Sequence, residues 1–482
     1  MKFRPRFLAL ALLAMLPSGL DARKTVDDTK AGLNWLDAGF ATYDAIQKAI
    51  FEYAEPGYQE YRSSEELASH LESNGFAVER GAAGIPTAFV ATFGSGGPVV
   101  GLLAEYDALP GQNQDTTCVN HPAVPGAPGH ACGHNLLGTA TVASAVAISK
   151  WLALGHQGTV KLFGCPAEEG GGGKVYMTRA GCFDGCDAVF DWHPSTESYV
   201  SMSGGLANVL VNFTFRGTAS HASVAPENGR SALDAVEAFD HMMNLMREHV
   251  SSDARIHYII TDGGQSANTV PERASVQYYI RHPEAETVRA ILDRAIKAAE
   301  GAALGTGTTM SYELMGGNYE RFINRSLAEV FLRNLVKVGG LDLDESELAY
   351  AHEMLVNSGI SDFSVMEKMT GVDPVLRPAV KGGPSSDVGN VSQVAPLANL
   401  RYCACVPAGG SHSWQQASIG GTTIGTKALM NVARIFYLSA LDLYRSPSLV
   451  QTIRDEYRSV RGDDFEFRPL IGDREPPFDY CK

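Results

Sequence analysis

The chain has 482 residues, of which 45% are hydrophobic and 19% are charged, and its formal net charge is -15 at pH 7. This composition is that of a globular protein rather than a disordered one, and the length favours two domains over one. The negative charge argues against nucleic acid or an anionic membrane surface as a partner, because neither attracts an acidic protein. A small anionic substrate is compatible with this charge, because arginines close to a site can outweigh a distant field.

The N-terminus has the residue order of a secretory signal. Lys2, Arg4 and Arg6 precede an apolar run over residues 7–16, and small residues follow it. The run is too short to span a bilayer well. We therefore interpret residues 1–22 as a signal peptide, with an uncleaved N-terminal anchor as the alternative. A periplasmic or secreted protein is expected, with no membrane contact beyond its export.

In chain order, the first part of the mature chain alternates helices with short buried strands. The predicted elements are helices over 35–54, 63–74 and 136–154 and strands over 99–104, 159–164 and 188–190. This alternation indicates an α/β domain with a mostly parallel sheet. Polar residues follow each strand: Asp107 the first, Glu168 and Glu169 the second, and His193 the third. Open α/β sheets place their sites at these carboxyl ends of the strands.

Residues 205–318 have a different periodicity. The predicted elements are strands over 209–215, 255–261, 274–281 and 308–315 and helices over 231–250 and 285–303. The resulting order, βαββαβ, is the ferredoxin-like pattern. Because His193 precedes this segment and His412 follows it, the simplest geometry is a small domain inserted into a larger one. The larger domain then comprises residues 23–204 and 319–445, ends with a helix over 426–444, and is followed by a C-terminal tail over 446–482.

The segment from Gly129 to Asn135 carries the most specific chemistry. Cys132 and His134 are separated by one glycine, so a tight turn can direct both side chains at one ion. Thiolate and imidazole are ligands that zinc and similar divalent ions favour. For Cys132 taken alone, the alternative is a buried and inert cysteine.

Glu168 and Glu169 are adjacent, so in an extended segment their side chains point in different directions. One can bind a metal while the other faces a metal-bound water, whose pKa the ion lowers to about 7. Such a carboxylate can accept a proton and pass it to a leaving amine. The alternative is a solvated acidic pair before a glycine loop. Asp107 can orient a ligand histidine, or form an Asx-type turn before Pro110.

Four motifs occur in order along the chain. They are Ala104-Glu105-Tyr106-Asp107-Ala108-Leu109-Pro110, Gly129-His130-Ala131-Cys132-Gly133-His134, Pro166-Ala167-Glu168-Glu169-Gly170-Gly171-Gly172 and Gly410-Ser411-His412-Ser413. Together they resemble the amidohydrolase branch of the metal-dependent aminoacylase/carboxypeptidase family, over roughly residues 35–445. Asn135 follows the Cys-Gly-His motif directly, where many members of the branch have aspartate. This departure favours the subgroup that hydrolyses p-aminobenzoyl-glutamate.

The resemblance implies a site with two divalent metal ions per subunit, either zinc or manganese. The implied ligands are Cys132, His134, Glu169, His193 and His412. Glu168 is implied as the general base and acid, and Asp107 as a carboxylate that supports a ligand histidine. The resemblance also implies that the insert is a lid and dimerisation domain. We therefore expect a homodimer, or a pairing with a homologous second subunit.

The same resemblance implies functional roles for three further residues of the insert. The segment Gly217-Thr218-Ala219-Ser220-His221-Ala222-Ser223 resembles one whose histidine reaches the active site of the partner subunit and stabilises an oxyanion there. Asn268 resembles an asparagine beside that site. Arg281 resembles an arginine that binds the substrate's free carboxylate, to which a guanidinium is well suited. The alternatives are a surface histidine, an asparagine in a turn and an arginine in a salt bridge.

The expected function is that of a metal-dependent amidohydrolase. It would cleave the amide bond of an N-acyl or N-aroyl amino acid such as p-aminobenzoyl-glutamate. A dipeptidase or carboxypeptidase with the same residues is the alternative within the family. A non-catalytic periplasmic protein that binds metal or a ligand is less favoured, because a ligand set together with a general base is more than binding requires.

Overall fold

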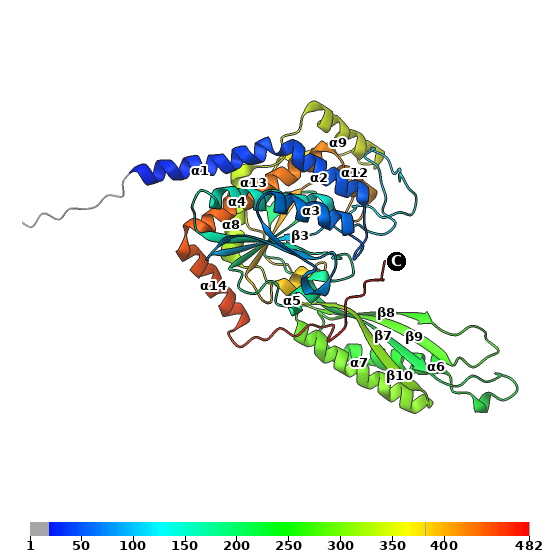
Figure 1. Ribbon diagram of the computed structural model, residues 1–482. Helices are drawn as coiled ribbons and strands as arrows, with labels where there is room; N and C mark the ends of the chain where they lie inside the picture. The colour runs from blue at the N-terminus through cyan, green and yellow to red at the C-terminus, as the bar shows by residue number, and fades with distance from the viewer. Residues whose placement is uncertain (1–18, 381, 482) are drawn as a thin grey trace, which may run out of the picture.

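The computed structural model describes residues 19–380 and 382–481, so the predicted signal peptide of residues 1–22 lies almost entirely outside the described residues. Two sheets are present, one of seven strands in a larger domain and one of four strands in an inserted domain (Figure 1). Across the described part of the chain, no helix has both the length and the apolar character that a membrane span requires.

The seven-stranded sheet has the order β1-β2-β4-β3-β5-β11-β6. Its four inner strands are parallel: β4 (Gly158–Gly164), β3 (Val99–Ala104), β5 (Ala188–Ser195) and β11 (Leu397–Cys403). The strands β1 (Ala77–Arg80), β2 (Phe89–Ser95) and β6 (Tyr199–Val200) form antiparallel pairs at the edges. The α/β prediction with a parallel sheet and an inserted domain is confirmed, and the three edge strands, which the sequence did not reveal, extend this parallel sheet in antiparallel orientation.

Helices cover both faces of this sheet. One face packs against α4 (His134–Leu152), α8 (Arg325–Val338) and α13 (Thr423–Arg445), and the other against α5 (Gly173–Arg179) and α11 (Val388–Val391). Leu102 of β3 lies in the first core and Leu103 in the second, because successive side chains of a strand point to opposite faces. Further helices of this domain are α3 (Tyr61–Ser73), α9 (Glu345–Asn357), α10 (Glu367–Thr370), α12 (Trp414–Gly420) and the short 3₁₀ turns Ala82–Gly84 and Phe363–Met366.

Two helical predictions differ from the structure. The single helix predicted over 35–54 is divided at Gly39 into α1 (Gly19–Ala38) and α2 (Phe40–Tyr53). The stretch treated as a tail from residue 446 contains α14 (Pro447–Arg461), which packs against α8. Val450 and Ile453 of α14 are buried, and most of its other residues are charged or polar, so its apolar residues form one narrow face of the helix.

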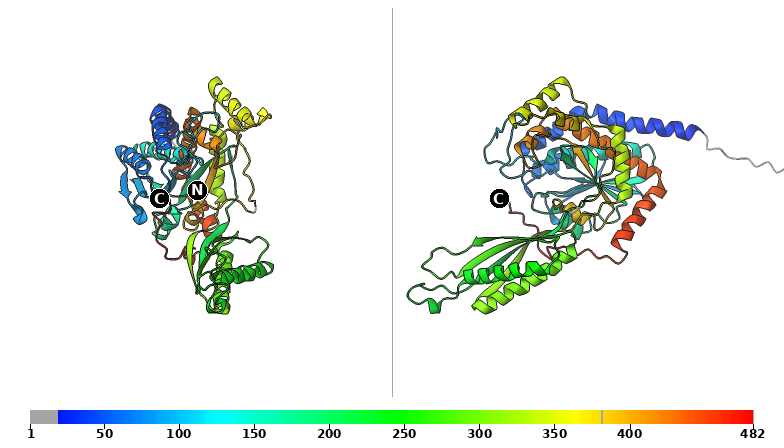
Figure 2. Two further views of the ribbon diagram at one scale, coloured as in Figure 1. Left: turned by 90° about the vertical axis from the view of Figure 1, so that its right-hand side faces the viewer. Right: turned by 180° about the vertical axis from the view of Figure 1, so that it is seen from behind.

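The inserted domain has the predicted βαββαβ order. Its elements are β7 (Ala207–Arg216), α6 (Ala232–Met246), β8 (Arg255–Asp262), β9 (Arg273–His282), α7 (Ala285–Thr306) and β10 (Thr309–Asn318), with 3₁₀ turns at Pro226–Asn228 and Arg247–His249. The sheet order is β10-β7-β9-β8. Both helices lie on one face of this sheet (Figure 2), where they bury the alternate residues Val209, Val211, Phe213 and Phe215 of β7. Among the described residues of the insert, no helix lies on the opposite face of the sheet.

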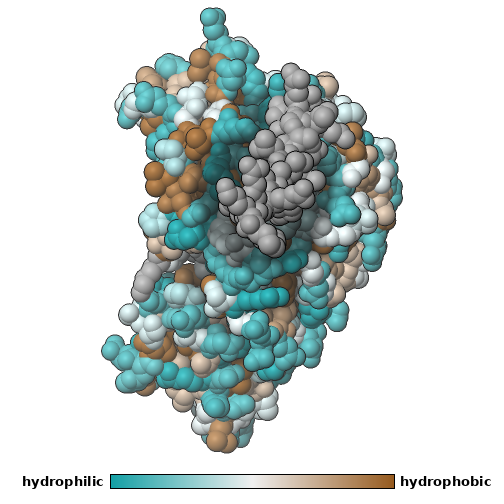
Figure 3. Space-filling view, turned by 90° about the vertical axis from the view of Figure 1, so that its left-hand side faces the viewer, coloured by the Kyte–Doolittle hydropathy of each residue, from teal (hydrophilic) through white to brown (hydrophobic). Residues whose placement is uncertain are grey.

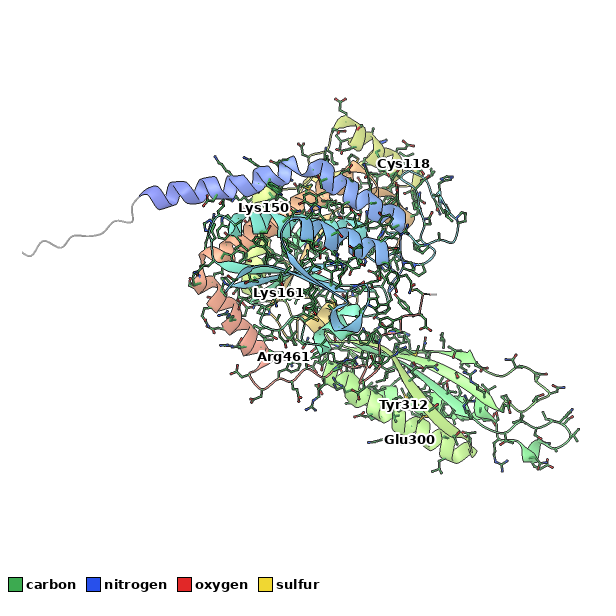
Figure 4. The ribbon with its side chains drawn as sticks, viewed as in Figure 1. Cys118, Lys150, Lys161, Glu300, Tyr312 and Arg461 are labelled. Carbon is green, nitrogen blue, oxygen red and sulfur yellow. The ribbon has the colours of Figure 1, made fainter. Side chains whose placement is uncertain are left out.

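Residues 462–481, which we call the C-terminal strap, connect the two domains. Leu470 is buried against the core of the insert, and the Arg474 guanidinium donates to the carbonyl of Met315 there. Arg179 of the larger domain donates to the Arg474 carbonyl at 2.9 Å. The strap begins after Arg461, labelled in Figure 4, and its end returns to the larger domain, where the ring of Tyr480 lies 5.8 Å from that of Tyr58.

Strand β8 is an edge of the insert's sheet and is unusually exposed for an apolar strand. The side chains of Tyr258, Ile259 and Ile260 are 37%, 62% and 45% exposed. Elsewhere, on the face shown in Figure 3, hydrophobic and hydrophilic side chains are interspersed over both domains. An exposed apolar edge strand is a template for pairing with another strand.

We expect Phe331→Ala to destabilise the larger domain by about 3–5 kcal/mol, because it removes a buried aromatic side chain. The ring of Phe331 lies 4.9 Å from that of Phe190 and 5.2 Å from that of Phe436. Urea unfolding followed by tryptophan fluorescence measures this change, since all four tryptophans lie in the larger domain. Val336→Ala on the same helix is the control, because Val336 is 48% exposed. Equal effects of the two changes would contradict the packing described.

Candidate metal centre

Six predicted site residues converge with Glu105 at the carboxyl edge of the four parallel strands. Their donor atoms form three overlapping groups, in each of which all donor atoms lie within 4.8 Å of one another. The groups are Cys132, His134 and His193; Glu105, His134, Glu168 and His193; and Cys132, Glu169 and His412. Asp107 joins them through hydrogen bonds to His134 and Glu169. The Sγ atom of Cys132 belongs to two of the groups and therefore lies between two potential ion positions.

Backbone conformations outside the usual regions present several of these side chains. Gly133, directly before α4, has a φ of +74°, and a Cβ there would lie 2.8 Å from Pro194. Ala167 and His412 have φ values of +57° and +62°, in the left-handed region that non-glycine residues rarely adopt. The His412 N–H donates to the Ala131 carbonyl at 3.0 Å, which ties the late loop to the Cys132 turn. Such strained residues cluster at functional sites.

Asp107 orients two members of the centre at once. Its Oδ1 lies 2.8 Å from Nδ1 of His134, and its Oδ2 accepts the backbone N–H of Glu169 at 2.9 Å. Burial favours the protonated form of this carboxyl, but the charge of His134 outweighs it and holds the pKa of Asp107 below its usual range. Because the carboxylate occupies Nδ1, the Nε2 atom of His134 is the one directed into the cluster.

The charges of the centre suit a cation. The hydrogen bond to Cys132 and the neighbouring Glu169 raise the pKa of His412 to about 10. Burial opposes protonation of His134, yet Cys132, Asp107 and Glu105 together raise its pKa well above the usual value. The raised pKa values of both imidazoles therefore result from an excess of negative charge around them, which a divalent ion would neutralise.

Several buried donor atoms of the centre have no hydrogen-bond partner among the described residues. They are Oε2 of Glu105, Nε2 of His134 and Nδ1 of His193, whereas the other Glu105 oxygen, Oε1, lies 2.7 Å from Nζ of Lys174. Burying such atoms without a partner is costly. A thiolate, imidazoles and carboxylates are also the donor types that zinc and manganese take. The residues present therefore fit a divalent metal.

Two residues of the centre were missed in the sequence. Glu105 lies two positions before Asp107 and is completely buried. Lys174 is also completely buried, and its Nζ lies 2.7 Å from Glu105 and 2.8 Å from Asp387. Burial alone would lower the pKa of Lys174, but Asp387 and Glu105 raise it well above its usual value. The position of Glu105 inside a motif was a usable signal, whereas a lysine after four glycines gave none.

Glu168 lines a cavity of about 130 Å³ between the two domains. The other walls are the glycine loop of residues 170–172 and the helix-free face of the insert's sheet, including Asn208 and Tyr279. Burial and the charges of Glu105 and Glu169 raise the pKa of Glu168 well above its usual value. This carboxyl thus lies beside the ligand cluster and on the wall of a space where a small molecule can approach.

Arg281 lies beside this cavity. It is the Cα partner of Asn208 across β7 and β9, and its guanidinium stacks 3.9 Å from the ring centroid of Tyr279. Because Asn208 and Tyr279 both line the cavity, Arg281 is placed within reach of a carboxylate bound there.

His221 and Asn268 lie together at the other end of the insert. The Ala222 N–H donates to the Asn268 carbonyl at 2.9 Å, and His221 forms a β-bridge with Thr269. Both residues lie in loops at the end of the sheet that is farther from the larger domain. The ten residues of β7 extend about 30 Å, because a strand rises about 3.3 Å per residue. Within one chain, His221 and Asn268 are therefore not brought to the ligand cluster.

Known proteins are similar to this chain over most of its length. The sequence profile described as peptidase family M20/M25/M40 matches residues 101–379. The chain is 38% identical over 451 residues to one of the subunits of p-aminobenzoyl-glutamate hydrolase from Escherichia coli (strain K12), covering 88% of this chain and 94% of that protein. It is 29% identical over 439 residues to Xaa-Arg dipeptidase of Mus musculus, covering 88% and 90%. The fold is similar to that of a dinuclear metal-binding peptidase of the M20 family from Bacillus subtilis, with a TM-score of 0.55 and 17% identity, covering 84% and 99%.

We expect Asp107→Asn to weaken metal binding about 10–100-fold, because one amide cannot accept hydrogen bonds on both of its atoms. The amide nitrogen would face either His134 Nδ1 or the Glu169 N–H. Titration of metal-free protein with zinc against a chromophoric chelator gives the affinity. Asp293→Asn, at an exposed position of α7, is the control. Unchanged affinity in the Asp107 variant would contradict its orienting role.

Proposed function

The chain belongs to peptidase family M20/M25/M40 and is a hydrolase that acts on amide bonds, and from this premise we propose that it is a metal-dependent amidohydrolase of N-acyl or N-aroyl amino acids such as p-aminobenzoyl-glutamate. The observation that carries the proposal is the convergence of one thiolate, three imidazoles and a carboxylate beside Glu168. A ligand cluster next to a carboxyl on a cavity wall is the arrangement that metal-assisted hydrolysis requires.

The ligands proposed for two divalent ions, zinc or manganese, are Cys132, His134, Glu169, His193 and His412. When bound, the ions would supply a water of lowered pKa and polarise the substrate carbonyl. The name of the Bacillus subtilis protein, a dinuclear metal-binding peptidase, supports the count of two. The overlap of the donor groups at Cys132 supports it independently.

The chain's own residues then perform the proton transfers and hold the substrate. Glu168 accepts a proton from the attacking water at its carboxylate and delivers it to the leaving amine. Asp107 keeps the His134 ring in one orientation through its 2.8 Å hydrogen bond. Arg281 binds the free carboxylate of the amino-acid part, for which a guanidinium provides two parallel donors.

The proposed substrate class rests on two arguments. The 38% identical relative acts, by its name, on p-aminobenzoyl-glutamate, and the match covers nearly the whole of both chains. An arginine beside the cavity of Glu168 suits a substrate with a free carboxylate. A dipeptidase activity is the second candidate, because the 29% identical relative is named for Xaa-Arg dipeptides, which also carry a free carboxylate.

We propose that the protein acts as a homodimer in which His221 serves the site of the other subunit. His221 and Asn268 lie about 30 Å along the insert from its junction with the larger domain, so they can reach a metal centre only in another copy. The exposed edge strand β8, with Tyr258 and Ile259, offers a surface for pairing two inserts. Pairing with a homologous second subunit is the alternative, which the name of the Escherichia coli relative supports because it describes one subunit of a hydrolase.

Export to the periplasm or the medium is proposed from the N-terminal residues alone. Lys2, Arg4 and Arg6 before an apolar run are the features that support it. Mass determination of the N-terminus of protein recovered from a periplasmic fraction tests this proposal, and protein confined to the cytoplasm would contradict it.

We expect Glu168→Gln to lower turnover about 10²–10⁴-fold, because the proton acceptor is lost, while the bound metal is retained. Activity is measured on p-aminobenzoyl-glutamate, hippurate and an Xaa-Arg dipeptide, and metal content by elemental analysis. Glu300→Gln, at an exposed position labelled in Figure 4, is the matched control. Chelator treatment of the wild type should abolish activity, and zinc or manganese should restore it. Full activity of Glu168→Gln would refute the mechanism, and preferred turnover of the dipeptide would favour the second candidate.

A mixture of two inactive variants tests the sharing of sites between subunits. We expect His221→Ala to lower turnover about 10²–10³-fold through loss of oxyanion stabilisation. After the Glu168→Gln and His221→Ala proteins are dissociated and reassembled together, half of the dimers carry both variants. One site of each such dimer then has both native residues, so about a quarter of the wild-type activity should return. Recovery would be absent if His221 served its own chain, and full activity of the His221→Ala protein alone would show that His221 serves no site.

A further inference from the structure

We propose that Glu105 is a further metal-binding residue of this centre and that Lys174 is the residue that positions it. The inference rests on the proposed metal dependence and adds to it a carboxylate ligand, together with the buried charges that hold this ligand in place. Neither residue is among the ligands inferred from the motifs.

The first argument is the direction in which Glu105 points. Its side chain is completely buried, and its Oε2 lies 3.1 Å from Nε2 of His134 and 3.3 Å from Nε2 of His193. Asp107 already occupies the Nδ1 atom of His134, so Nε2 is the atom left to bind an ion. The carboxylate oxygen is therefore placed where the free nitrogens of two ligand histidines converge.

The second argument is the spacing of these three atoms. Ligands bound at about 2.0–2.1 Å to one tetrahedral ion are separated by about 3.3 Å, and those of an octahedral ion by about 2.9 Å. The separations of 3.1 and 3.3 Å fall in this range. An ion pair between Glu105 and His134 is the competing explanation, but the 3.1 Å contact of Oε2 with Nε2 does not have hydrogen-bond geometry.

The third argument is the chain of charges behind Glu105. The Nζ of Lys174 lies 2.7 Å from the other oxygen, Oε1, and 2.8 Å from Oδ1 of Asp387. Asp387 also accepts the backbone N–H of Lys174 at 2.9 Å, so the lysine is fixed at both its backbone and its ammonium group. Lys174 thus holds one oxygen of Glu105 and leaves the other directed at the imidazoles. It also supplies the positive charge without which a buried carboxylate would be strongly destabilising.

An additional carboxylate has a consequence for the choice of metal. Oxygen ligands suit manganese better than zinc, and a further ligand allows more than four donors around one ion. We therefore expect removal of the Glu105 carboxylate to weaken manganese binding more than zinc binding.

The test measures metal binding directly, in the full-length metal-free protein. Glu105→Gln should weaken manganese binding at least about tenfold, and Glu105→Asp should weaken it less, because it keeps the charge. Lys174→Met should weaken it in the same direction. Glu347→Gln is the matched control, since Glu347 is also a buried glutamate paired with a lysine, Lys427, away from the centre. Affinities within twofold of the wild type for both Glu105 variants would overturn the proposal.

A second measurement needs no variant and therefore does not depend on the folding of one. In a crystal structure of the wild-type protein loaded with zinc or manganese, a Glu105 oxygen should lie about 2.0–2.2 Å from an ion. A separation above about 3 Å would overturn the proposal. A wild-type protein that bound no metal under any of these conditions would instead refute the proposed function itself, so the two failures are distinguishable.

Discussion

The parallel alignment of β4, β3, β5 and β11 is the constraint on which the metal centre depends. Because all four strands run the same way, segments separated by up to 300 residues of sequence leave the sheet at one edge. This shared edge brings Asp107, Glu169, His193 and His412 near one another, and the local backbone at Ala167 and His412 then directs the side chains. The insert interrupts the chain after His193 without disturbing that edge, since β11 returns to pair with β5 in parallel register.

The centre is also an assembly of charges that the folded chain buries together. The carboxyls of Glu105, Asp107, Glu168 and Asp387 lie within or beside it, and Lys174 and Arg321 are buried cations next to them. In the low dielectric constant of the protein interior, such an excess of carboxylates is unfavourable unless a cation binds among them. The buried carboxylates therefore repel one another in the metal-free protein. Binding of a divalent cation relieves this repulsion, which contributes to the affinity for metal.

Sequence reasoning reached the fold class, the inserted βαββαβ unit and the cluster around Cys132, because each leaves a local pattern. The alternation from Val209 to Phe215 and the Cys-Gly-His turn can be read within ten residues. The edge strand β1 was missed because three of its four residues are exposed, so it has no apolar periodicity. Lys174 was missed because its burial is decided by Asp387, a residue 213 positions later. Contacts of this kind are fixed by tertiary structure and leave no trace in the local sequence.

The C-terminal strap contacts both domains and follows both of them in the chain. Leu470 of the strap belongs to the core of the insert, whereas the ring of Tyr480 lies 5.8 Å from that of Tyr58 in the larger domain. The strap therefore adds contacts between the domains to those made near the two ends of the insert, where Ser385 donates to the Leu206 carbonyl and Asn390 donates to Asn318. Residues 462–481 follow every strand of both sheets in the chain. A translating ribosome thus completes both sheets before it makes the segment that packs against both domains.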